Sequence, residues 1–315
     1  DGNGIDEDCD GEADEVFNFT PLDAALDAKV YDADIAVSDS GTLYGIFYDR
    51  GPWGWDPTAS VFIDLAGTPT HLLLPEDARY CGVSAGSQVW FACAIPNEDG
   101  SAATLKAWRY DEDLKRIVNE EVITEIDAVD DPDGVDLLLG PDGMYPVVAL
   151  CDGSAQLHFR DPTSGMWDFV EASTCEWDIQ LAEPVVESEL SEIHMVWGSE
   201  YGSDSEVSYG RISCDDAGCE WLESGAFVTG YEAQIIVHPD TGLPIIHMAW
   251  GSTFSLWRHD GKDWDYTSLH SLSSTTNIHT GAVWATSDST CVVYVDYQDD
   301  HCLLYTSDAA DDLYR

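Results

Sequence analysis

The first residues of the chain contain the side chains best suited to binding a metal ion. Asp6, Asp8 and Asp10 stand at alternate positions, a glycine follows, and Glu12 and Asp14 continue the acidic series. Ca²⁺ takes about six to eight oxygen ligands, and alternate side chains converge on one ion where a glycine permits a sharp turn. The spacing predicts a calcium site formed by all five acidic residues, with Glu12 contributing its backbone carbonyl.

This candidate site departs from a complete calcium loop at one position. Phe17 stands where a bidentate glutamate is expected, so Glu15 or another loop must complete the coordination shell. An acidic, solvated linker is the alternative, because runs of charge usually only keep a segment in water. The regular spacing favours calcium.

The stretch Asn3–Glu15 resembles the end of the metal-binding repeats of secreted and surface proteins from myxobacteria and related bacteria, which are similar to thrombospondin type 3 calcium repeats. The resemblance implies that Asp6, Asp8 and Asp10 bind calcium and that Cys9 pairs within a repeat array. The chain opens inside this motif without Met, so we expect it to be a piece of a longer product.

Two histidines and one serine are further candidates for chemistry. His194 and His247 occupy the same place in two copies of a hexapeptide, which raises the possibility of a shared metal or ligand. Strand alternation puts His194 on the face opposite Ile193, so packed histidines are the preferred interpretation. Ser84 lies in a nucleophile-elbow pattern, but between two strands instead of before a helix. No nucleophile, base and orienting group can be named together, so catalysis is less favoured than binding.

Closely spaced cysteines predict disulfide bonds, because opposed residues on adjacent strands approach within the distance that a disulfide spans. The expected pairs are Cys81 with Cys93, Cys151 with Cys175, and Cys214 with Cys219. Disulfides persist in oxidising compartments, so the sequence predicts an extracellular or cell-surface protein. Buried free thiols are the alternative.

The composition excludes several partners. Lys and Arg number 12 against 61 Asp and Glu, which gives a net charge of −49 and repels nucleic acids and anionic membranes. The longest apolar stretches are far shorter than the roughly 20 residues of a membrane helix, so no membrane span is expected. With 44% hydrophobic residues, the chain is too apolar to be disordered.

A repeat supplies the elements that must position these residues. Ile193–Gly198 recurs as Ile246–Gly251, and weaker copies follow Asp/Gly or Ser-rich turns at spacings of about 50 residues. The weaker copies are Leu43–Tyr48, Val89–Ile95, Tyr145–Leu150 and Cys291–Val295. Trp197 and Trp250, which end the two strong copies, are expected to pack between repeats, and sugar stacking is their less favoured role.

Each copy predicts four short antiparallel strands, as in Ile235–Val237, Ile245–Trp250, Ser255–Arg258 and Trp264–Ser268. Leu22–Lys29 has at most one helical turn. Four antiparallel strands per period are typical of a β-propeller, and the repeat style resembles bacterial extracellular β-propeller arrays. We predict an all-β propeller of six blades, with seven blades as the nearest alternative and two β-sandwich domains as the other architecture.

The two ends of the chain carry separate predictions. Phe17–Thr20 matches the outer-strand segments Trp167–Val170 and Trp264–Thr267, so it is expected to complete the last blade and join the chain ends. Cys302–Asp312 resembles the translation of a transposase adapter used in sequencing libraries; a genuine polar tail is the alternative. The predicted organisation is a calcium-binding repeat end at 1–15, a β-propeller at 16–301 and a foreign tail at 302–315.

These features predict a calcium-binding propeller whose loops bind a polysaccharide or an extracellular protein, in ligand binding or adhesion. The alternative is a secreted carbohydrate-active enzyme, either a glycosidase or a sialidase-like enzyme. Its support in the sequence is weak, because Asp260–Trp264 is at best a degenerate form of the sialidase Asp-box. A basic or carboxylate-lined central pocket with strongly shifted pKa values would favour the enzyme, and an empty channel would favour binding.

Overall fold

The computed structural model describes residues 30–50, 57–64, 70–73, 78–97, 102–127, 134–139, 146–161, 164–182, 191–200, 205–215, 218–250, 253–271, 278–285, 289–296 and 301–308. The calcium candidates, Phe17–Thr20 and Leu22–Lys29 lie outside these residues. Within the described ranges the chain forms strands and turns, and no helix there is long and apolar enough to cross a membrane.

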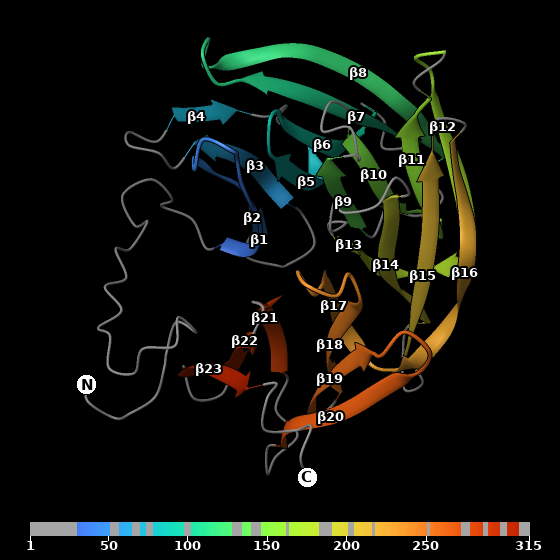
Figure 1. Ribbon diagram of the computed structural model, residues 1–315. Coiled ribbons are helices and arrows are strands. Elements are labelled where there is room, and N and C mark those ends of the chain that lie inside the picture. The colour runs from blue at the N-terminus through green and yellow to red at the C-terminus, as the bar shows by residue number, and fades with distance from the viewer. Residues whose placement is uncertain are drawn as a thin grey trace.

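The strands form antiparallel sheets, each built from one continuous stretch of chain (Figure 1). Sheet 1 contains β1 (Val30–Val37), β2 (Leu43–Arg50), β3 (Pro57–Asp64) and β4 (Thr70–Leu73). Sheet 2 contains β5 (Arg79–Ala85), β6 (Val89–Pro96), β7 (Ala102–Asp111) and β8 (Arg116–Asp127). Sheet 3 contains β9 (Gly134–Leu139), β10 (Pro146–Cys151), β11 (Gly153–Arg160) and β12 (Trp167–Cys175).

The remaining strands follow the same order. Sheet 4 contains β13 (Trp177–Ala182), β14 (Ser191–Glu200), β15 (Glu206–Asp215) and β16 (Gly218–Thr229). Sheet 5 contains β17 (Tyr231–Val237), β18 (Pro244–Trp250), β19 (Thr253–His259) and β20 (Trp264–Ser271). Sheet 6 has three described strands, β21 (Ile278–Ala285), β22 (Ser289–Asp296) and β23 (His301–Asp308).

The sheets stand around a common centre, with the first strand of each sheet innermost (Figure 1). These first strands contact one another in chain order, from β1 through β5, β9, β13 and β17 to β21. The predicted β-propeller is therefore confirmed, and the two-sandwich alternative is wrong. Phe17–Thr20, which is expected to close the ring, lies outside the described ranges, so the number of six blades stays a prediction.

The repeat copies all fall on the second strand of a sheet, namely on β2, β6, β10, β14, β18 and β22. In sheet 3 this strand is covered on both faces by the neighbouring sheets, and every residue of β10 is buried. A strand buried on both faces requires a continuous apolar run, which explains why this element carries the strongest sequence signal.

Side chains of neighbouring sheets pack into shared cores. The core between sheets 3 and 4 contains Met195 and Trp197 of β14, and Trp197 is only 1% exposed. Its indole Nε1 donates a hydrogen bond to the carbonyl of Thr174 in β12, at 3.1 Å. Trp197 therefore packs between repeats, as predicted, whereas the side chain of Trp250 lies outside the described part.

Hydrogen bonds from backbone to side chain join the innermost strands of successive sheets. The N–H of Val83 donates to Asp34 Oδ2 at 2.6 Å, and the N–H of Leu139 donates to Ser84 Oγ at 3.0 Å. The N–H of Leu181 donates to Asp136 Oδ2 at 2.6 Å. Each acceptor belongs to the earlier sheet and each donor to the later one. We call these three contacts the inner-strand locks.

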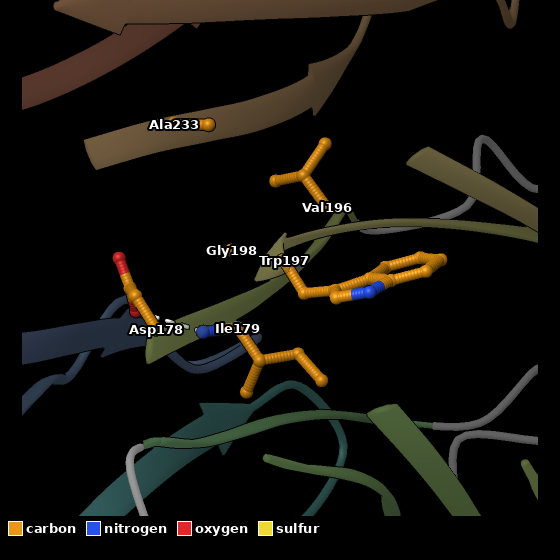
Figure 2. Close-up of a pocket in the computed structure, with 6 residues that line it drawn as sticks. All are labelled: Asp178, Ile179, Val196, Trp197, Gly198 and Ala233. Atoms are coloured by element: carbon orange, nitrogen blue, oxygen red, sulfur yellow. Dashed lines mark hydrogen bonds between the residues drawn. The ribbon is translucent and has the colours of Figure 1, made fainter. Parts of the chain in front are cut away.

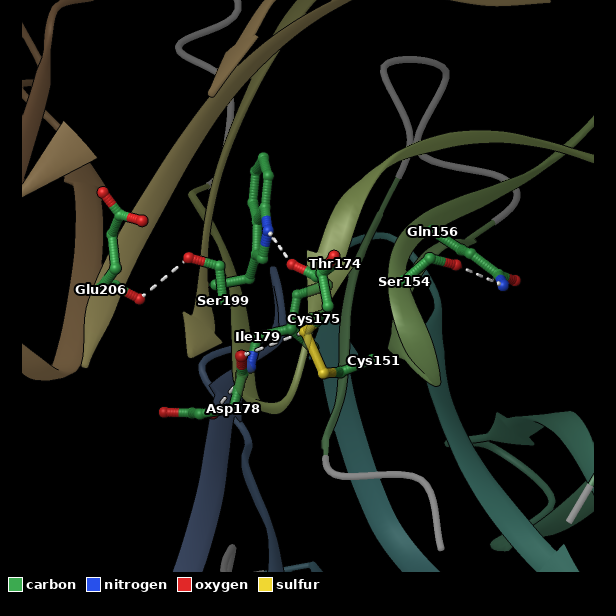
Figure 3. The surroundings of a disulfide bond; sticks show 10 residues. Cys151, Ser154, Gln156, Thr174, Cys175, Asp178, Ile179, Ser199 and Glu206 are labelled. Atoms are coloured by element: carbon green, nitrogen blue, oxygen red, sulfur yellow. Dashed lines mark hydrogen bonds between the residues drawn. A yellow bond between two sulfur atoms is a disulfide. The ribbon is translucent and has the colours of Figure 1, made fainter. Parts of the chain in front are cut away.

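In the described part of the chain, three disulfide bonds cross-link strands within single sheets. Cys81–Cys93 joins β5 to β6 and Cys214–Cys219 joins β15 to β16, each with a Cα–Cα distance of 4.1 Å. Cys151–Cys175 joins β10 to β12 across the intervening strand, at 5.4 Å (Figure 3). The pairs are those that the cysteine spacings predict.

The third strand of sheet 6 includes most of the segment from Cys302 onward that resembles an adapter. Its residues pair with β22 in regular antiparallel register, as in Val293 with Leu304. Whether this segment is foreign to the protein stays a prediction, which resequencing the source DNA across His301 tests.

Candidate functional site

The interface between sheets 4 and 5 holds the largest described group of contacting aromatic side chains. Trp264, at the start of β20, packs against Tyr209 and Phe227 of sheet 4, with ring centroids 5.1 Å and 4.7 Å apart. Tyr266 lies two residues further along β20, so alternation places it on the same face. Its side chain is 52% exposed. Trp264 therefore joins the two sheets, and Tyr266 presents its ring to solvent.

Tyr266 packs on the ring of Trp257, and Trp257 packs on the ring of Phe227. Trp257 is its cross-strand partner on β19, and the ring centroids are 4.9 Å apart at a tilt of 56°. Trp257 in turn contacts Phe227 of sheet 4, at 5.2 Å. Tyr266, Trp257 and Phe227 together form a surface that we call the Tyr266 ledge. Because the rings restrain one another, the ledge is a preformed apolar surface.

Charged residues lie near the same interface. Arg211 of β15 lies between two carboxylates, 3.4 Å from Glu192 and 3.4 Å from Glu223. His259 of β19 contacts Trp264, with ring centroids 5.1 Å apart. The interface therefore combines an aromatic ledge with hydrogen-bond donors and acceptors.

A histidine and a tyrosine lie buried close to these charged residues. His194 Nδ1 is 2.7 Å from the hydroxyl of Tyr209. Burial lowers the pKa of His194 to about 4, and the nearby charges of Arg211 and His259 act in the same direction. Burial also raises the pKa of Tyr209 well above its ordinary value. Both groups are neutral near pH 7, which favours a packing role.

The structure separates the two repeat histidines. His194 and Val196 share the face of β14 that packs on sheet 5, where Val196 joins a core with Ile246 and Met248 of β18. His247 alternates with those two residues and lies on the opposite face of sheet 5. The possibility of a shared metal or ligand is therefore wrong, and burial of both histidines is confirmed. In the described ranges no group of three or more His, Cys, Asp or Glu residues could hold a metal ion.

Carboxylates gather near the inner strands. Burial raises the pKa of Asp136 well above its usual value, and the charges of Asp34 and Asp178 add to this effect. Backbone hydrogen bonds from Leu181 and Leu137 oppose it. Asp136 and Asp34 are acceptors in the inner-strand locks, so holding the sheets together accounts for their presence there.

A small hollow lies beside these inner strands, between sheets 4 and 5 (Figure 2). It encloses about 140 Å³, open solvent included, and is lined by Asp178, Ile179, Val196, Trp197, Gly198 and Ala233. Ligand sites for organic molecules usually measure about 300–1,000 Å³, so the hollow is too small for a sugar ring and its neighbours.

The structure gives structural roles to the remaining candidate residues from the sequence. Ser84 is 2% exposed, and its hydroxyl oxygen accepts a hydrogen bond from the N–H of Leu139, so it is not a nucleophile. Asp260 begins the β19–β20 turn, where its carboxylate accepts the N–H groups of Lys262 and Asp263. Sequence reasoning identified Trp264 but missed the ledge. The aromatic residue two positions after Trp264 was the available signal.

The chain matches no protein-family model and no curated protein. It is similar in structure to an α-L-arabinofuranosidase from Fusarium graminearum, solved with an iminosugar inhibitor, at 11% identity and a TM-score of 0.52, over 90% of this chain and 94% of that one. It is also similar to an α-L-arabinanase from Penicillium chrysogenum, solved with arabinobiose, at 12% identity and a TM-score of 0.51, over 91% and 95%. At these identities the likeness shows the fold alone, and that fold is the β-propeller.

Proposed function

We propose that this protein binds a neutral carbohydrate on the Tyr266 ledge, where sheets 4 and 5 meet. The observation that carries the proposal is the exposed ring of Tyr266, which rests on Trp257, while Trp257 rests on Phe227. The C–H face of a sugar ring is apolar and packs on an aromatic face, while its hydroxyls need donors and acceptors. Arg211 and Glu223 are the charged groups of sheet 4 that can supply them.

The preference for a neutral ligand follows from the charge of the chain. A net charge of −49 repels acidic polysaccharides at long range, whereas it leaves neutral sugars unaffected. The two similar structures come from enzymes named for arabinose-containing substrates. Arabinobiose is therefore a reasonable first probe, together with cellobiose and mannobiose.

The test is calorimetric titration of these disaccharides, and of a neutral glycan array, against the chain and its variants. Tyr266→Ala should weaken binding about tenfold or more, because interface aromatics carry much of the binding energy. Tyr266→Phe keeps the ring and should bind nearly as well. Leu222→Ala, at an exposed apolar residue of β16, is the control. Absence of binding to every neutral glycan, or unchanged binding by Tyr266→Ala, would overturn the proposal.

The proposal places the protein outside the cell or on its surface and gives it a calcium-binding head. Three disulfides support the location, because such bonds persist in oxidising compartments. The alternate spacing of Asp6, Asp8 and Asp10 supports the head.

A further inference from the structure

The fourth strand of sheet 3 repeats the arrangement that forms the Tyr266 ledge. We infer that Phe169 is the centre of a second carbohydrate site, so that one chain binds a neutral polysaccharide at two places. This inference rests on the function proposed for the Tyr266 ledge. It starts from the motif Trp167-Asp168-Phe169, which matches Trp264-Asp265-Tyr266 in sequence and in its place on the outer strand.

Phe169 presents a supported ring to solvent. Its side chain is 49% exposed, and it stacks on its cross-strand partner His158 with centroids 5.3 Å apart and planes 29° from parallel. His158 is almost completely buried, and its Nε2 is 3.0 Å from Gln156 Oε1. Burial lowers the pKa of His158 to about 4, so the supporting ring is uncharged near pH 7. His158 thus takes the place that Trp257 has under Tyr266.

Trp167 joins its sheet to the preceding one, as Trp264 does. Its indole Nε1 donates to Glu121 Oε2 of β8 at 3.0 Å. Arg160 donates to Glu121 Oε1 at 3.2 Å, and Asn119 donates to the same oxygen at 2.8 Å. An arginine–carboxylate pair therefore lies near Trp167 too. Arg160 and Glu121 join sheets 3 and 2, whereas Arg211 and Glu223 both belong to sheet 4.

The outer strands of sheets 2 and 4 carry no comparable described ring. The exposed large apolar residue of β8 is Val122, and that of β16 is Leu222. Trp221 of β16 is partly buried and lies against Trp197. Single exposed apolar residues on a protein surface need no explanation. Two exposed rings do need one when both stand two residues after a tryptophan of the outer strand and both rest on an aromatic cross-strand partner. The two rings lie on separate sheets, so one polymer could engage both and gain affinity through effective concentration.

The experiment measures stoichiometry and affinity separately. Titration with arabinobiose, cellobiose and mannobiose should give about two sites for the unaltered chain. Phe169→Ala should remove one site and leave the affinity of the other unchanged, and Tyr266→Ala should do the converse. The double variant should lose binding. Met166→Ala, at an exposed apolar residue of the same hairpin, is the matched control.

Binding of a polysaccharide such as debranched arabinan adds a second readout. Either single variant should weaken it about tenfold or more, because simultaneous engagement is lost. Circular dichroism checks that each variant is folded. One site that Phe169→Ala leaves intact would overturn the second site and leave the proposed function standing. No binding by the unaltered chain would overturn the proposed function itself.

Discussion

Three buried histidines give the protein a predictable response to acid. Burial lowers the pKa values of His158, His194 and His247 to about 4, from an ordinary value near 6.5. Below about pH 6.5 these histidines bind protons in the unfolded chain, whereas in the folded chain they stay neutral until the pH approaches 4. Their contribution to stability is therefore complete above about pH 6.5 and is lost as the pH falls towards 4. The loss is at most about 1.4 kcal/mol per pH unit for each histidine.

The two repeat histidines should differ when replaced. His247 is completely buried, and neither ring nitrogen has a hydrogen-bond partner among the described residues, whereas His194 is bonded to Tyr209. His247→Leu should be neutral or stabilising at pH 7 and should reduce the acid loss between pH 6.5 and 4. His194→Leu should lose about 1–3 kcal/mol, because it leaves the Tyr209 hydroxyl unsatisfied. Urea unfolding at several pH values measures both; equal pH slopes for His247→Leu and the unaltered chain would contradict this prediction.

Sequence reasoning at the residue scale worked where neighbours along the chain decide the outcome. The partner of Cys214 is five residues away, and the burial of His194 follows from alternation along its own strand. The exposure of Tyr266 depends instead on where the adjacent sheet ends. The role of Asp136 depends on a backbone donor 45 residues away. In a chain with 61 acidic residues, one such aspartate carries no distinguishing signal.

Among the elements, the disulfides should contribute unequally. Cys151–Cys175 encloses a sequence separation of 24 residues, and Cys214–Cys219 encloses 5. In the chain-entropy account a longer closed loop restricts the unfolded chain more, which favours the longer bridge by about 1 kcal/mol. Replacing both cysteines of the longer pair by alanine should therefore lower stability more. Urea unfolding of the two double variants tests the order, and a larger loss for Cys214→Ala/Cys219→Ala would reverse it.

The sheets were predictable as elements because each is complete within one repeat. Neighbouring strands such as β18 and β19 pair across a short turn, and the second strand of sheet 3 is apolar because both its faces are buried. The closure of the ring by Phe17–Thr20 stays a prediction, because these residues lie outside the described ranges.

For the whole molecule, the sequence predicts that calcium binding and the stability of the propeller depend on different residues. Calcium should bind the head through Asp6, Asp8 and Asp10 with a weak affinity of about 10⁻⁴–10⁻³ M, because Phe17 leaves the shell incomplete. The cores between sheets consist of apolar residues far along the chain, so removal of calcium should leave their melting temperature nearly unchanged. Calorimetric titration and thermal melting measure the two effects.

The control for this prediction is the triple variant Asp6→Ala/Asp8→Ala/Asp10→Ala. It should release no heat of calcium binding and should melt like the unaltered chain. Equal heats in both chains would show that the head is not the site. A large drop in melting temperature on adding chelator would show that calcium holds the propeller together.

The inner-strand locks form in a fixed order during synthesis, because each acceptor is made before its donor. The acceptors Asp34, Ser84 and Asp136 leave the ribosome 49, 55 and 45 residues before their donors. Sheets 1, 2 and 3 therefore each present the acceptor of a lock at the inner edge before the next sheet supplies its donor. A chain that stops between two of these sheets should expose that edge to chaperones and proteases.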